Sequence, residues 1–176
     1  DGLRKVKKVR VAIAGATGAV GAELLRQLET RSFPVESVRP LASERSQGAS
    51  VSFCGESIPV SVLGADSFRD VDLALFSCGA ARSRDFAPEA VRAGAVVVDN
   101  SSAFRMDPTV PLVVPEINGD AASKHAGIVA NPNCTTIVTL MAVAPLVAHA
   151  GVASLRVASY QAASGAGPKA VEELRA

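Results

Sequence analysis

The sequence is poor in the residues that most metal sites and disulfide frameworks need. It contains two histidines and three cysteines, Cys54, Cys78 and Cys134, at unrelated spacings. An odd number of cysteines so placed matches neither a disulfide framework nor a zinc site, and two histidines leave little for another metal centre. We therefore expect no bound metal and no disulfide.

Long apolar runs are also missing. No stretch of about 18 consecutive apolar residues occurs, and no charged start leads into an apolar segment with a cleavage site. These absences argue against a membrane span and against a secretory signal. We expect a soluble intracellular protein without a membrane partner, cytoplasmic or, where the host is a plant or an alga, in the chloroplast.

The sequence has no large excess of charge of one sign, with 18 basic and 17 acidic residues. Five of the basic residues form a short arm near the start, at positions 4, 5, 7, 8 and 10. So short a basic arm before a buried strand is expected to be a solvated tail, and nucleic acid is not an expected partner.

The chain does not begin with Met and stops within a helical pattern at 172–176, so we expect a fragment of a longer protein.

Short apolar runs alternate with amphipathic segments along the chain, and each run is closed by Gly, Pro, Asn or Ser. This order predicts an α/β fold with a doubly wound parallel sheet. Pro145 is expected to kink or shorten the last long helix. Helices are expected at 18–30, 82–93 and 132–150, and strands at 9–14, 35–42, 73–76, 95–99, 112–114, 127–130 and 152–163, with 51–53 and 58–63 as a hairpin-like pair.

Three glycines, Gly15, Gly18 and Gly21, lie between the first expected strand and the first expected helix. In a Rossmann-type fold the first such glycine permits the turn, the second lets the backbone approach a pyrophosphate, and the third lets helix and strand pack closely. A tight turn without a ligand is the alternative, but the placement favours a dinucleotide site. The candidate cofactor residues are Gly15, Thr17, Gly18, Ala19, Val20 and Gly21.

The end of the second expected strand usually decides between NAD and NADP. Here Ser43, Arg45 and Ser46 offer two hydroxyls and a guanidinium, which suit a 2′-phosphate and favour NADP. Glu44 does not fit this preference for NADP, because a carboxylate at this position either binds a ribose hydroxyl, as in NAD sites, or points to solvent. A third loop, at Ser77, Cys78 and Gly79, follows another expected strand and is placed to cover the cofactor.

Cys134 follows Asn131, Pro132 and Asn133 at the expected start of an apolar helix. Free N–H groups and the helix dipole at such a position favour the thiolate, which is the nucleophilic form. Most single cysteines are inert fillers, and that interpretation is kept for Cys54 and Cys78. Cys134 is therefore the candidate nucleophile.

Six segments occur in the order seen in aspartate-semialdehyde dehydrogenases, which the chain resembles from about residue 9 to residue 176. They are 15–21, 41–46, 99–105, 114–118, 131–136 and 159–167. N-acetyl-glutamyl-phosphate reductases usually have glycine before and tyrosine after the reactive cysteine, unlike Asn133 and Thr135. Glyceraldehyde-phosphate dehydrogenases share the Cys-Thr-Thr run but not the surrounding pattern.

The resemblance implies a reaction and roles for particular residues. Cys134 attacks β-aspartyl phosphate, phosphate leaves, and NADPH reduces the resulting thioester to aspartate semialdehyde, a step in the biosynthesis of lysine, threonine, methionine and isoleucine. Arg105 binds the substrate phosphate, Asn133 positions the acyl oxygen, and Gln161 contacts substrate near the reacting carbon. Ser164 and Gly165 match a loop on the nicotinamide side.

The resemblance also implies an organisation. Residues 1–131 form the NADP-binding Rossmann-type domain, and 132–176 begin an α+β catalytic and dimerisation domain. The family's acid-base histidine and carboxylate-binding arginine lie further along, so His125 and His149 are expected to be structural. The implied full-length protein is a homodimer or homotetramer with small-molecule substrates. The alternatives are a non-catalytic NADP-binding module and an N-acetyl-glutamyl-phosphate reductase.

Overall fold

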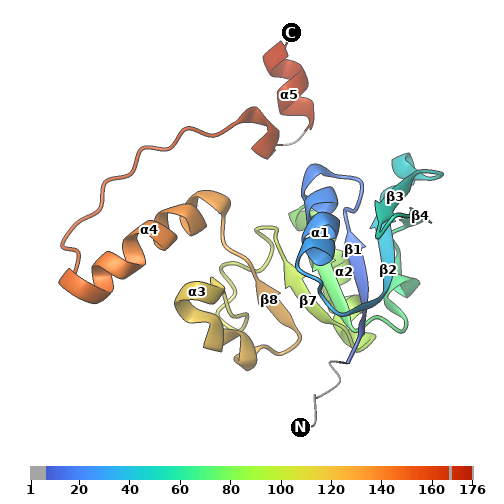
Figure 1. Ribbon diagram of the computed structural model, residues 1–176, viewed down its shortest axis with the longest axis horizontal. Helices are drawn as coiled ribbons and strands as arrows, with labels where there is room; N and C mark the ends of the chain where they lie inside the picture. The colour runs from blue at the N-terminus through green and yellow to red at the C-terminus, as the bar shows by residue number, and fades with distance from the viewer. Residues whose placement is uncertain (1–6, 167, 176) are drawn as a thin grey trace. The chain divides into compact units, whose positions relative to one another are not determined.

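The computed structural model describes residues 7–166 and 168–175 (Figure 1). Contacts between Cα atoms divide the chain into two units, Asp1–Asn133 and Cys134–Ala176, which are described separately. Arg4 and Lys5 of the basic arm and Gly167 of the last motif lie outside the described residues. The domain boundary after residue 131 remains a prediction.

The first unit is built on a parallel sheet of six strands in the order β5-β2-β1-β6-β7-β8. This order, with β1 in the middle and the chain winding outward on both sides, confirms the predicted doubly wound Rossmann-type fold. The strands are β1 Val9–Ala14, β2 Val35–Ala42, β5 Ser61–Val62, β6 Leu73–Phe76, β7 Val96–Asp99 and β8 Ile128–Ala130.

Two helices cover opposite faces of this sheet, α1 Ala19–Thr30 and α2 Ala80–Arg92 (Figure 1). Successive side chains of a strand point to opposite faces, so β1 supplies both cores. Val11 and Ile13 pack with Leu25 and Leu28 of α1. On the other face, Ala12 and Ala14 of β1 join a cluster with Phe68, Phe76, Ala87 and Ala90. Both faces of the sheet are therefore apolar around β1.

The predicted hairpin is present, but its second strand is shorter than expected. β3 Ser50–Phe53 and β4 Glu56–Pro59 form a separate antiparallel pair around a turn at Cys54 and Gly55, both of which have positive φ. The expected strand 58–63 divides, because Leu63 donates its N–H to Ala42 and β5 pairs with β2 in the parallel sheet. The segment 58–63 therefore contributes to two sheets.

The strand predicted at 112–114 is wrong. Leu112 makes a single parallel bridge with Ala130, and Pro115 then begins the short helix α3 Pro115–Asn118. Proline has no N–H to donate to a ladder and favours the first turn of a helix, so the pairing stops there. The 3-10 turns of this unit are η1 Glu44–Ser46, η2 Ala65–Phe68 and η3 Gly119–Lys124.

The second unit contains α4 Cys134–Ala150, η4 Ala163–Ala166 and α5 Pro168–Arg175. Pro145 lies within α4, so the expected shortening at this proline does not occur. The strand predicted at 152–163 is also wrong, because residues 151–162 are exposed coil. A strand needs a neighbour to accept its backbone hydrogen bonds, and the described part of this unit contains none.

Candidate active site

The first and the third glycine of the motif, Gly15 in the turn after β1 and Gly21 in the first turn of α1, are required by close backbone packing. Gly15 has φ +94, and a Cβ there would overlap the carbonyl oxygen of Ser77. A Cβ on Gly21 would overlap the backbone of Gly15 and Ala16. These contacts fit the turn and packing roles that the spacing predicts for the two glycines.

Gly18 differs, because only the carbonyl oxygen of Gly15 comes near its Cβ position, at 3.3 Å. Residues 17–20 are exposed at the start of α1, where a helix presents N–H groups without intrahelical partners. A phosphate has both access and donors at such a terminus. The open backbone around Gly18 therefore fits a pyrophosphate, and the residues present fit a dinucleotide.

The loop after β2 meets this glycine loop. The hydroxyl oxygens of Thr17 and Ser46 are 3.1 Å apart, within hydrogen-bond distance. Ser46 closes the 3-10 turn η1, which also holds Glu44 and Arg45. The structure thus brings together the first two predicted cofactor loops, as expected for the carboxyl ends of adjacent parallel strands.

The third predicted loop also joins this edge of the sheet. Ser77 donates its N–H to the carbonyl of Ala14, and Gly79 has φ +88 immediately before α2. Burial raises the pKa of the Cys78 thiol, whose sulfur lies 4.0 Å from the hydroxyl oxygen of Ser83. A thiol with a raised pKa is a poor nucleophile, which agrees with the sequence-based interpretation of Cys78.

A cavity of about 270 Å³ opens between the loop after β2 and the first turns of α2. Ser43 and Arg45 were predicted from the sequence as cofactor residues and Glu44 as a residue opposing NADP, whereas Arg82 and Phe86 were missed. The signal for the missed pair was topological, because α2 begins at the same edge of the sheet as the glycine loop. The full lining is Ser43, Glu44, Arg45, Val62, Leu63, Arg82 and Phe86.

A buried carboxylate fixes the end of β7 beneath these loops. Asp99 accepts hydrogen bonds from the hydroxyls of Ser83 and Ser101, at 2.8 Å and 2.7 Å, and from the N–H of Ser101 at 3.1 Å. A buried charge is tolerated when it is hydrogen-bonded in this way. The network joins α2 to the segment that leads to Arg105.

Arg105, the predicted phosphate ligand, lies across the ends of β7 and β8. Its Nε donates to the carbonyl of Asn131 and a terminal nitrogen donates to the carbonyl of Asn100, both at 2.9 Å. The amide nitrogen of Asn131 in turn donates to Asn100 Oδ1 at 2.6 Å. These bonds use part of the guanidinium and leave other N–H donors for a phosphate.

The remaining predicted residues lie at or beyond the junction of the two units. Asn133 ends the first unit, and Cys134 begins α4 with an exposed side chain, so the predicted place of this cysteine at a helix start is confirmed. Gln161 is exposed in the coil, and its amide lies over Gly165, which follows Ser164 in η4. The chemical roles of these residues remain predictions.

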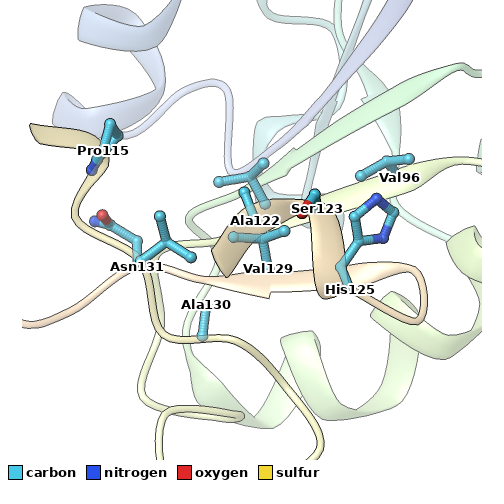
Figure 2. A pocket seen from close by; sticks show the side chains of 10 residues that line it. Val96, Pro115, Ala122, Ser123, His125, Val129, Ala130 and Asn131 are labelled. Atoms are coloured by element: carbon cyan, nitrogen blue, oxygen red, sulfur yellow. The ribbon is translucent and has the colours of Figure 1, made fainter. Parts of the chain in front are cut away.

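The two histidines lie in different elements, and their structural role remains a prediction. His125 Nδ1 accepts the N–H of Gly127 at 2.9 Å, and the ring lines an apolar cavity of about 430 Å³ with Val96 and Val129 (Figure 2). His149 is in the last turn of α4. Among the residues that the structure describes, no cluster of three metal-ligating side chains occurs and no helix is long and apolar enough to cross a membrane.

The doubly wound sheet, with a glycine loop and two further loops gathered at its carboxyl edge, defines a Rossmann-type dinucleotide-binding domain. A family model described as "Semialdehyde dehydrogenase, NAD binding domain" matches residues 10–125, and the chain belongs to this family. The sequence-based resemblance is therefore confirmed.

Individual relatives agree with this assignment. The aspartate-semialdehyde dehydrogenase of Synechocystis sp. is 53% identical over 95% of this chain and 49% of its own length. The crystal structure of aspartate semialdehyde dehydrogenase II from Vibrio cholerae is 44% identical with a TM-score of 0.92, over 96% of this chain and 51% of that one. The Candida albicans enzyme solved with NADP is 27% identical, with a TM-score of 0.63, over 82% of this chain and 48% of that one. The chain thus spans about half the length of the curated relatives it matches.

Proposed function

We propose that this chain is the cofactor-binding half of an NADP-dependent aspartate-semialdehyde dehydrogenase and supplies its nucleophile, Cys134. The observation that carries the proposal is the meeting of three loops, after β1, β2 and β6, at one edge of the sheet. The position of Cys134 at the start of α4 and the 53% identity to the Synechocystis relative support it.

The proposed reaction begins at Cys134. Its thiolate attacks the acyl carbon of β-aspartyl phosphate, and inorganic phosphate leaves with the electron pair of the broken C–O bond. Bound NADPH supplies a hydride to the thioester, and the thiolate then departs as aspartate semialdehyde forms. A thioester accepts hydride more readily than a carboxylate does, which is why a cysteine is needed.

The other residues bind and orient the substrate in this proposal. Arg105 offers its remaining guanidinium donors to the phosphate, and Asn133 positions the acyl oxygen. Gln161 contacts the substrate near the reacting carbon. Ser164 and Gly165 form the nicotinamide side of the site. In the cell the protein acts in the cytoplasm, on small-molecule substrates, in biosynthesis of the aspartate family of amino acids.

A fusion protein tests the proposal. The chain is joined to the remaining half of the Synechocystis relative, and phosphate-dependent reduction of NADP⁺ by aspartate semialdehyde is followed. We expect activity that Cys134→Ala abolishes without loss of NADP⁺ binding, because the proposal makes Cys134 the nucleophile and places the cofactor in the loops after β1, β2 and β6. A folded fusion that binds NADP⁺ but is inactive would favour a non-catalytic module. Activity only with the acetylated glutamyl substrate would favour the reductase.

A further inference from the structure

Two arginines from different parts of the sequence line the cavity between the loop after β2 and helix α2. Arg45 belongs to η1, and Arg82 lies in the first turn of α2. Glu44 is the third charged residue in the lining, so the cavity carries two cations and one anion. An anionic ligand is favoured in such a cavity.

Neither arginine is engaged within the described part of the chain. Four other arginines, at positions 10, 26, 69 and 92, form ion pairs with nearby carboxylates, but Arg45 and Arg82 have no ion pair or hydrogen bond with any described residue. A cation in the first turn also opposes the helix dipole, so Arg82 does not stabilise α2. The guanidinium donors of both residues remain available to a ligand.

The lining of the cavity combines apolar and polar side chains. Leu63 and Phe86 pack against the buried cluster that covers this face of the sheet, and Val62 completes an apolar wall. The polar lining is formed by Ser43, Glu44, Arg45 and Arg82. An adenosine with a phosphate on its ribose has the same division, with a flat apolar base and a charged group.

We propose that Arg82 is a second determinant of the preference for NADP and binds the adenosine 2′-phosphate together with Arg45. The inference rests on the proposed function, because the ligand is the cofactor assigned there. A phosphate dianion accepts hydrogen bonds from more than one guanidinium, whose planar fork of donors matches its oxygens. With two arginines and one carboxylate, Glu44, the charged residues of the lining sum to a net positive charge.

Two small ligands isolate this contact from the rest of the cofactor. Adenosine 2′,5′-bisphosphate and 5′-AMP differ only in the 2′-phosphate, and the binding of each to the full chain is measured by calorimetry at fixed ionic strength. We expect Arg82→Ala to weaken the bisphosphate about tenfold or more, as for one lost hydrogen bond to a charged group, and 5′-AMP less than twofold. Arg82→Lys should restore part of the loss.

Arg84 provides the matched control. It lies on the same helix, is exposed and does not line the cavity, so Arg84→Ala should leave both ligands unchanged. An Arg82→Ala chain that binds both ligands as the Arg84→Ala chain does would overturn the inference, and so would an equal loss for both ligands. Circular dichroism checks the fold of each variant, and Arg82→Gln replaces any variant that fails to fold.

The wild-type chain separates this inference from the proposed function. If the wild-type chain binds neither ligand, the cofactor assignment fails and the role of Arg82 fails with it. If it prefers the bisphosphate and only Arg45→Ala removes that preference, the cofactor assignment stands and the role of Arg82 is rejected. Equal affinity for the two ligands contradicts the preference for NADP itself.

Discussion

The hydroxyl of Ser83 in α2 donates a 2.8 Å hydrogen bond to the carboxylate of Asp99 at the end of β7, and both side chains are fully buried. A buried carboxylate without donors would be costly, so this bond couples a helix and a strand directly beneath the loops of the candidate site. Asp99 also holds Ser101, which begins the segment that leads to Arg105. The hydrogen bonds of Asp99 therefore support both the loops of the predicted cofactor site and the segment that carries Arg105, the predicted phosphate ligand.

Ser83→Ala should lower the free energy of unfolding by about 1–3 kcal/mol, because it leaves a buried carboxylate with one donor fewer. Urea denaturation followed by circular dichroism measures the change. Ser102→Ala is the matched control, since Ser102 is exposed nearby, and it should change the free energy by less than about 0.5 kcal/mol. Equal effects of the two substitutions would show that the Ser83 bond contributes nothing.

Alanine at two glycines of the same motif should separate folding from cofactor binding. Gly21→Ala forces a Cβ into the backbone of Gly15 and Ala16 and should prevent native folding. Gly18→Ala meets only one atom at 3.3 Å, so the chain should fold while NADP⁺ binds at least about tenfold more weakly. Thermal unfolding and NADP⁺ titration measure the two effects. Unchanged NADP⁺ affinity in Gly18→Ala would place the pyrophosphate elsewhere.

Much of the first unit could be predicted because its central strands are short, mostly apolar segments with clear ends. β1 and β6 are mostly apolar and end at Gly15 and Ser77, whereas β2 carries polar residues in its first half and becomes buried only toward Ala42. The strands expected at 112–114 and 152–163 failed for a different reason. Whether an apolar run becomes a strand depends on a distant neighbour to pair with, and local composition does not report this.

The candidate site shows the same division between local and distant information. The glycine loop was recognisable because its backbone contacts constrain residues close in sequence. Arg82 was missed because a charged residue on an amphipathic helix has the pattern of a solvated face. Only the parallel order of β2, β1 and β6 brings α2 beside the loop of Arg45.

The ion pair between Arg10 and Asp72 should make stability depend on pH at the acid end. The Arg10 guanidinium donates to both carboxylate oxygens, at 3.0 and 3.2 Å, and holds the pKa of Asp72 well below its usual value. A carboxyl whose pKa is lower in the folded state stabilises the fold above its unfolded pKa, about 3.9, and loses this contribution as pH falls below that value.

The thermal midpoint of the wild-type chain should therefore fall between about pH 4 and pH 2, and it should fall less in Asp72→Asn. Calorimetry across this range measures the slopes. Glu56→Gln removes an exposed carboxyl that pairs with no cation among the described residues, so its slope should match the wild type. An Asp72→Asn chain with the wild-type slope would contradict the role of the pair.

The three cysteines should differ in their rates of alkylation. Burial raises the pKa of Cys78, which lowers its thiolate fraction at any pH near neutrality, while Cys54 and Cys134 are exposed. Iodoacetamide at pH 7.5 should therefore modify Cys78 last, as measured by mass spectrometry of digested samples over time. Raising the pH should increase the rate at Cys78. Fast modification of Cys78 at neutral pH would show that its loop opens readily.

Glu44→Gln should shift the cofactor preference further toward NADP. The Glu44 carboxylate lines the same cavity as Arg45 and Arg82, so it repels a 2′-phosphate bound there and offers an acceptor to the free ribose hydroxyl of NAD. Its removal should tighten NADP⁺ binding severalfold, in keeping with about 1 kcal/mol between nearby solvated charges, and weaken NAD⁺. Titrations of both cofactors at low and high salt measure the change. The gain for NADP⁺ should shrink at high salt because exposed charges are screened, whereas an equal change for both cofactors would place the 2′-phosphate away from this cavity.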